Sequence, residues 1–170
     1  ADTAAAMDVE GAFVSLDGTR INGQGRGTGL RSRGEGSDVA IVNAVVTGLR
    51  IGIHNSDGAS LSVTRSVVSG NDEWGLRNDD PTLCLKTPLV YWGSALGPDD
   101  PSDAEDGCLN GGNANPDGDK VSDDVDWWPY AVDTSWRPSS GLGPNPWRAF
   151  GPTAVRRGSN CSPSRRRSPT

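Results

Sequence analysis

The sequence has few apolar residues and few of the residues that metal or redox chemistry needs. Apolar residues make up 34% of its 170 residues, aromatic residues make up 6%, and there are one His, one Met and three Cys. No apolar run is long enough to cross a membrane, so we expect no membrane span. The cysteines form no C-x-x-C motif, which argues against a structural zinc site. The composition therefore allows one modest hydrophobic core.

Charge is unevenly distributed along the chain, whose formal net charge is −6. Residues 99–126 carry ten acidic residues and one basic residue, whereas residues 137–170 carry seven Arg and no acid. Because the rest of the chain is also slightly acidic, we expect the folded body to repel nucleic acid. The Arg-rich tail has three open interpretations: it binds nucleic acid or an anionic surface, it lies loosely on the acidic segment, or it has no role.

The informative positive feature is an internal repeat with a spacing of 22 between residues 39 and 90. The predicted columns are Val39, Leu61 and Leu83; Ile41, Val63 and Leu85; and Val46, Val68 and Val90. With a longer step of 25, the same columns reach back to Val14, Leu16 and Ile21. A repeat this short cannot close its own core, so each copy must stack on the next.

Within each copy, apolar and polar residues alternate, which predicts short strands with one buried face. A fourth inward position follows each Gly-rich corner, as Leu30, Ile53 and Leu76. Asn55 and Asn78 share a column above Ser32, and we expect their side chains to hold the turn. The period of two and the many Gly residues exclude a helical repeat. The sequence therefore predicts an all-β fold, a right-handed parallel β-helix of about four coils.

The predicted organisation has four parts. Residues 1–11 are a lead-in or the end of an earlier coil, and residues 12–98 form the parallel β-helix. Residues 99–136 are an acidic loop followed by a C-terminal cap, in which four aromatic residues close the last coil. Residues 137–170 are rich in Arg, Pro and Ser, and we expect them to be disordered.

The predicted end of the β-helix carries a specific resemblance. The stretch YWGSALGP at residues 91–98 and the stretch GDKVSDDVDWWPY at residues 118–130 flank a variable acidic insert. Together they resemble the ending of bacterial right-handed parallel β-helix repeat proteins, which are similar to pectate lyases in architecture. The chain departs from that ending at Leu89 and Val90, where Asn is commoner, and at Tyr130, where Trp is usual. The resemblance implies this fold and a secreted or cell-surface location, and it implies no particular activity.

A calcium loop is one candidate site in the acidic segment. Oxygen-bearing residues stand at positions 1, 3, 5 and 12 of a loop with Gly at position 6, which is the spacing of an EF-hand-type loop. The candidate ligands are Asn113, Asn115, Asp117 and Asp124 at these positions, together with Asp119. The alternative is a solvated acidic turn, and no cofactor is otherwise required.

A disulfide between Cys84 and Cys108 is a second prediction, because Cys84 points outward from the last coil and Cys108 lies in the loop that follows. Such a bridge would fix the loop to the body and would imply an oxidising compartment. The alternative is three free thiols.

Carbohydrate chemistry is suggested by polar residues in the turns. β-Helix glycosidases use paired carboxylates, and the candidates here are Asp72, Glu73, Asp79 and Asp80, with Arg77 as an accompanying base. His54 and Arg77 share a column and, with the ring of Trp74, are candidates for binding sugar. The alternative is that all are surface or packing residues stacked by register.

From the sequence we expect a non-catalytic exported module that binds glycan or is structural at the cell surface, with polysaccharide as its candidate partner. The alternative is a fragment of a polysaccharide lyase or glycoside hydrolase acting on acidic polysaccharide. No pattern in the sequence indicates an oligomeric state.

Overall fold

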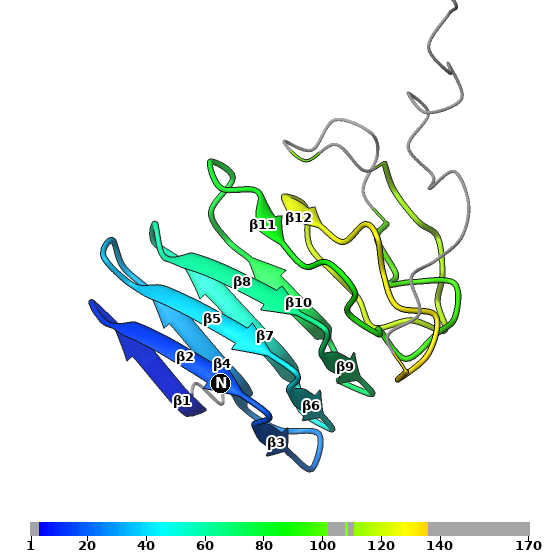
Figure 1. Ribbon diagram of the computed structural model, residues 1–170, viewed down its shortest axis with the longest axis horizontal. Helices are drawn as coiled ribbons and strands as arrows, with labels where there is room; N and C mark the ends of the chain where they lie inside the picture. The colour runs from blue at the N-terminus through cyan, green and yellow to red at the C-terminus, as the bar shows by residue number, and fades with distance from the viewer. Residues whose placement is uncertain (1–3, 102–107, 109–110, 136–170) are drawn as a thin grey trace, which may run out of the picture.

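The protein is an all-β solenoid in the computed structural model, which describes residues 4–101, 108 and 111–135. Twelve strands run along this part of the chain, and every strand pair within the three sheets is parallel. The strands stack as about four coils, with the N-terminal coil at one end and the cap at the other (Figure 1). The predicted all-β parallel β-helix is therefore confirmed as a β-solenoid.

Three parallel sheets form the sides of the solenoid. The first sheet contains β1 (Ala5–Glu10), β4 (Thr28–Arg33), β7 (Ile51–Ser56) and β10 (Trp74–Asn78). The second contains β2 (Phe13–Asp17), β5 (Asp38–Val42), β8 (Ser60–Thr64), β11 (Leu85–Lys86) and β12 (Val125–Asp126). The third contains β3 (Arg20–Asn22), β6 (Val45–Thr47) and β9 (Val67–Ser69).

The predicted register is confirmed in the first three coils. Val39 pairs with Leu61 at the spacing of 22, and Val14 pairs with Val39 at the spacing of 25. Leu30 and Ile53 pair in the first sheet, and both are fully buried. Stacked apolar columns of this kind remove a continuous strip of surface from water, and this burial is the main stabilising contribution in the fold.

The predicted register is wrong in the fourth coil, where every column is displaced by two residues. Lys86 pairs with Ser62, so Leu85 lies in the column of Leu61. The sequence predicts Leu83 at that position of the column. In the third sheet Tyr91 bridges Val67, which puts Trp92 in the column predicted for Val90. The reason is that the turn after β10 is longer than the turns of the earlier coils, so a fixed spacing of 22 no longer applies.

Side-chain ladders and close backbone contacts fix the turns. Asn55 Nδ2 donates to Asn78 Oδ1 at 3.2 Å, and Asn78 Nδ2 donates to the Leu83 carbonyl at 2.8 Å, as the predicted ladder requires. Three positions earlier on the same strands, a Cβ added to Gly52 would lie 2.6 Å from the Gly75 carbonyl oxygen. Only glycine permits the coils to approach this closely at that corner.

The cap closes the C-terminal end with buried aromatic rings, and Trp136, one of the four aromatic residues predicted for it, lies outside the described residues. Trp92 and Trp127 are fully buried, and the Trp127 indole N–H donates to Asp100 at 2.8 Å. Trp128 and Tyr130 pack against the same core with their ring centroids 5.4 Å apart. Within the residues that the structure describes there is no helix, and hence none long and apolar enough to cross a membrane.

Candidate functional site

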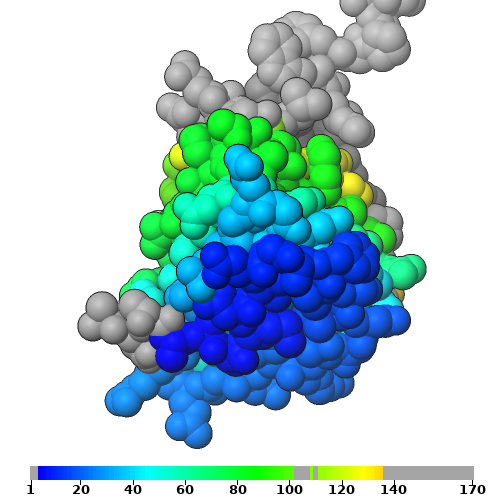
Figure 2. Space-filling view, turned by 90° about the vertical axis from the view of Figure 1, so that its left-hand side faces the viewer, coloured from blue at the N-terminus to red at the C-terminus, as the bar shows by residue number. Residues whose placement is uncertain are grey.

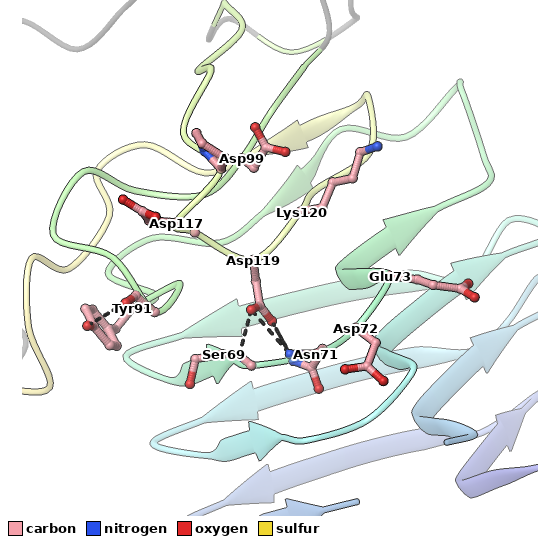
Figure 3. Close-up of a pocket in the computed structure, with 13 residues that line it drawn as sticks. Ser69, Asn71, Asp72, Glu73, Tyr91, Asp99, Asp117, Asp119 and Lys120 are labelled. Carbon is pink, nitrogen blue, oxygen red and sulfur yellow. Dashed lines mark hydrogen bonds between the residues drawn. The ribbon is translucent and has the colours of Figure 1, made fainter. Parts of the chain in front are cut away.

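A polar pocket lies where the repetitive body meets the irregular cap. It has a volume of about 660 Å³ and is lined by residues 69–73, from the end of β9 and the turn that leads to β10, and by residues 116–120 from the cap. Tyr91, Gly93 and Asp99 complete the lining. The two principal walls are therefore more than 40 residues apart in sequence, and the pocket exists only because the cap docks on the third coil (Figure 3).

Asp119 fixes this docking. Its carboxylate accepts hydrogen bonds from the Gly70 amide at 2.7 Å, from the Asn71 amide at 3.2 Å, and from Asn71 Nδ2 at 2.7 Å. The residue is buried, and this burial raises the pKa of the carboxyl group even though the hydrogen bonds oppose the shift. The nearby charge of Asp72 raises the pKa further. Asp119 therefore joins the cap to the body and is not free to bind a ligand.

Two other carboxylates of the pocket, Asp72 and Asp117, have no side-chain partner within the described part of the chain. Both are exposed, and they lie on opposite sides of Asp119 in Figure 3. The Tyr91 ring lies at the same wall as Asp117, held by a hydrogen bond from its hydroxyl group to the Gly93 carbonyl at 2.9 Å. The pocket is thus lined by two carboxylates that have no side-chain partner and by one aromatic ring.

The remaining charges of the pocket are partly neutralised by neighbours. Glu73 pairs with Arg50 at 2.7 Å. The Lys120 ammonium group lies 4.7 Å from the centre of the Trp74 ring, in cation–π geometry. Five acidic residues line the pocket against one basic residue, so its field is negative.

The predicted sugar-binding trio is only partly brought together. His54 and Arg77 are neighbours across β7 and β10, as predicted, and Asp79 bridges them with contacts of 2.8 Å to His54 Nε2 and 2.7 Å to Arg77 Nε. Burial would raise the pKa of Asp79, but the hydrogen bonds from both partners and the charge of Arg77 lower it overall. Trp74 stands three positions before Arg77 on β10, and its ring lies under the Lys120 ammonium group of the cap.

The four carboxylates considered for catalysis separate into two groups. Asp72 and Glu73 line the pocket before β10, whereas Asp79 and Asp80 follow β10. Asp80 accepts hydrogen bonds from the Gly58 amide at 2.9 Å and from the Thr82 hydroxyl group at 2.6 Å, and these contacts lower its pKa. At about 3.3 Å per strand residue the two groups are roughly 20 Å apart, which exceeds the separation of roughly 5–10 Å that a glycosidase pair needs.

Of the five side chains proposed as calcium ligands, Asn113, Asn115 and Asp119 make hydrogen bonds to other parts of the chain. Asn113 Nδ2 donates to the Pro98 carbonyl at 2.6 Å, and Asn115 Nδ2 donates to the Gly97 carbonyl at 2.5 Å. Asp119 binds the third coil, Asp117 lies in the pocket, and Asp124 is buried with a left-handed backbone. In the described residues, no group of three or more His, Cys, Asp or Glu side chains could hold a metal ion. Calcium binding stays a prediction.

A disulfide joins Cys84 to Cys108, with their Cα atoms 5.5 Å apart. It ties the segment after the body to the turn between β10 and β11, beyond the opposite end of β10 from the pocket. Cys161, the third cysteine, lies outside the described residues, as does the Arg-rich tail.

Sequence reasoning missed the Asp119 anchor and the Lys120–Trp74 contact. One signal was available, since Asn71 occupies the column of the buried Leu49, where a polar side chain requires a partner. No protein-family model, curated protein or solved structure matches the chain.

Proposed function

We propose that this chain is a non-catalytic glycan-binding module and that the pocket between residues 69–73 and 116–120 is its binding site. The observation that carries the proposal is the pocket itself, which is lined by the unbonded carboxylates of Asp72 and Asp117 and by Tyr91. A volume of about 660 Å³ falls within the range of roughly 300–1,000 Å³ that is typical of small-molecule sites.

A glycan suits this combination of groups. Carboxylate oxygens accept hydrogen bonds from sugar hydroxyl groups, and an aromatic ring packs against the apolar face of a sugar. The negative field of the pocket disfavours uronate polymers and other anionic ligands. The ligand that we propose is therefore a neutral glycan, and not the acidic polysaccharide that a pectate-lyase type of enzyme would use.

The four carboxylates that the sequence suggested for catalysis lie in two separate groups, which argues against their acting as one catalytic set. Acid–base cleavage needs two carboxyl groups held across one cleft. Asp79 is held by Arg77 and His54, Asp80 is held by its own turn, and both are roughly 20 Å from the pocket. Asp119 is committed to Gly70 and Asn71. The alternative function, a polysaccharide lyase or glycoside hydrolase, therefore has less support.

We also propose that the module is exported and works outside the cell or at its surface. The disulfide between Cys84 and Cys108 supports this location, because disulfides persist in oxidising compartments. The resemblance of residues 91–98 and 118–130 to the ending of bacterial right-handed parallel β-helix repeat proteins agrees with it. The pectate-lyase-like superfamily is accordingly the proposed affiliation of the fold.

The test is a glycan-binding screen followed by calorimetry on the best ligand. We expect Asp117→Asn and Asp72→Asn each to weaken binding by about tenfold, as loss of a charged acceptor worth about 1.4 kcal/mol implies. Asp38→Asn is the matched control, since it removes the same charge from an exposed position outside the pocket.

Three results would contradict the proposal. Binding that is equal in the pocket variants and in Asp38→Asn would move the site elsewhere. Stronger binding of pectate or alginate than of neutral glycans would contradict the argument from charge. New reducing ends or unsaturated products, lost in an Asp79→Asn variant, would show that the chain is an enzyme.

A further inference from the structure

The column of polar side chains that holds the turns after the first sheet is incomplete at one position. Ser32, Asn55 and Asn78 pair across β4, β7 and β10, so they follow one another along this column. Ser32 and Asn55 are fully buried, yet Ser32 Oγ and Asn55 Oδ1 have no hydrogen-bond partner in the described part of the chain. A buried polar atom without a partner lowers stability, so two of them on neighbouring coils require an explanation.

The orientation of the Asn55 amide group follows from its neighbours. Asn78 Nδ2 donates to the Leu83 carbonyl, so Asn78 Oδ1 is the atom that accepts from Asn55 Nδ2 at 3.2 Å. Asn55 Nδ2 also donates to the Ala59 carbonyl at 3.0 Å. Turning the Asn55 amide over would set oxygen against oxygen in both contacts. Asn55 Oδ1 is therefore an acceptor that lacks a donor, and the next residue of its column is Ser32.

The turns show which second acceptor belongs to the Ser32 position. Asn55 Nδ2 donates to the Ala59 carbonyl, and Asn78 makes the equivalent bond one coil further on. The register of the second sheet places Ser37 at the same point of the turn after β4. Ser37 is buried and its carbonyl accepts from the Ser60 amide at 2.9 Å, but a carbonyl oxygen can accept a second hydrogen bond. An amide group at the Ser32 position would donate to this carbonyl and to Asn55 Oδ1.

We propose that a buried water molecule binds at this position and does the work of the missing amide group. Ser32 Oγ donates to the water, and the water donates to Asn55 Oδ1 and to the Ser37 carbonyl. A serine oxygen stands where asparagine has its Cγ atom, so Ser32 is shorter by an amide nitrogen and an amide oxygen, which leaves room for about one water. Three hydrogen bonds to otherwise unpaired polar groups are typical of a buried water.

The proposed water site is enclosed by the first two coils. Ser32, Ser37 and Asn55 expose at most 2% of their surface. Val9 follows Ser32 in the same column, toward the first coil, and is also buried. The first coil forms a continuous surface when the solenoid is viewed from that end (Figure 2). A water in this place belongs to the fold, and it extends the polar column by one coil.

The first test uses the unmodified whole chain. A high-resolution crystal structure should show an ordered water within hydrogen-bond distance of Ser32 Oγ, Asn55 Oδ1 and the Ser37 carbonyl oxygen. Magnetic relaxation dispersion of the solvent nuclei should detect a long-lived water in solution. Well-defined protein around an empty position, or a metal ion with contacts shorter than hydrogen bonds, would overturn the proposal.

The second test fills the position with a side chain. Ser32→Asn should displace the water, because its amide group donates directly to Asn55 Oδ1 and to the Ser37 carbonyl. We expect one long-lived water fewer and a melting temperature that is higher by roughly 2–4 °C, since an immobilised water is released. Ser62→Asn is the matched control, because it makes the same change at an exposed strand position and should leave the water in place.

A third variant keeps the test decisive if Ser32→Asn does not fold. Ser32→Ala removes one partner of the water, so it should shorten the residence time of the water and lower the melting temperature by roughly 2–4 °C. An unchanged number of long-lived waters in a folded Ser32→Asn chain would overturn the proposal. An unchanged residence time in Ser32→Ala would do the same, because it would show that Ser32 Oγ does not hold the water.

Discussion

Removing the Asp119 carboxylate should detach the cap from the body. Asp119 lies 48 residues from Asn71, yet its carboxylate accepts hydrogen bonds from two backbone amides and from one side-chain amide of the turn at residues 70–71. Asp119→Ala would leave these three donors facing a cavity at the edge of the pocket. Asp119→Asn would keep the shape but would turn an amide N–H group toward at least one of the donors.

The magnitude follows from the contacts. A hydrogen bond to a charged group contributes about 1.5–3 kcal/mol, so three would contribute several kcal/mol if they were additive and if water could not replace them. The adjacent pocket lets water reach the donors, which reduces the loss. We expect Asp119→Ala to lower the free energy of unfolding by about 2–4 kcal/mol and Asp119→Asn by about half as much.

The assay is equilibrium unfolding in urea under non-reducing conditions, together with the thermal midpoint. For a domain of this size one kcal/mol corresponds to about 4 °C, so Asp119→Ala should lower Tm by roughly 8–16 °C. Asp117→Asn is the control, because Asp117 is exposed in the same segment and has no side-chain partner among the described residues. If Asp119→Ala and Asp117→Asn agree within about 0.5 kcal/mol, the anchoring role of Asp119 is refuted.

Three further predictions concern the body. Because the pKa of Asp79 in the folded protein is lowered from 3.8, its ion pairs stabilise the fold above that pH and lose their effect as the pH falls below it. Asp79→Asn should therefore melt below the unmodified chain at pH 6, with the difference closing as the pH falls below 3.8. Arg65 has a left-handed backbone (φ 45°), so Arg65→Asn should raise the unfolding free energy by about 0.5–1 kcal/mol in urea, and a decrease would show that its side chain is needed. The disulfide of Cys84 spans 24 residues, so Cys84→Ser should cost about 3 kcal/mol in the same assay, and an unchanged midpoint would rule out a stabilising bridge.

The strand register can be predicted from the sequence wherever the structure repeats. The columns of Val39 and Leu61, and of Leu30 and Ile53, follow from a nearly constant number of residues per coil. The same regularity places His54 beside Arg77, two residues that the sequence alone suggests for sugar binding. The predicted register is wrong by two residues from Leu85 on, because the turn after β10 is longer than the earlier turns. The hydrophobic pattern alone does not reveal the length of that turn.

The candidate site could not be predicted in the same way, because it is formed between the repetitive and the irregular parts of the chain. Asp72 and Glu73 were singled out for their charge, and Asp117 and Asp119 for their spacing in a calcium loop. Nothing in either pattern indicates that the two groups share one pocket, since no repeat relates the cap to the turn at residues 69–73.

Substitutions in the repetitive body and substitutions at its junction with the cap should have different effects. In the body each column residue has neighbours of its own kind in the next coil, so a substitution there acts on stability through packing. At the junction Asp119 and Asn71 have no such equivalents, and the pocket depends on this pair. Substitutions at Asp72 or Asp117 should therefore change binding while stability is kept. Substitutions at Asp119 should lower both binding and stability, because that carboxylate holds the cap wall of the pocket against the turn at residues 70–71.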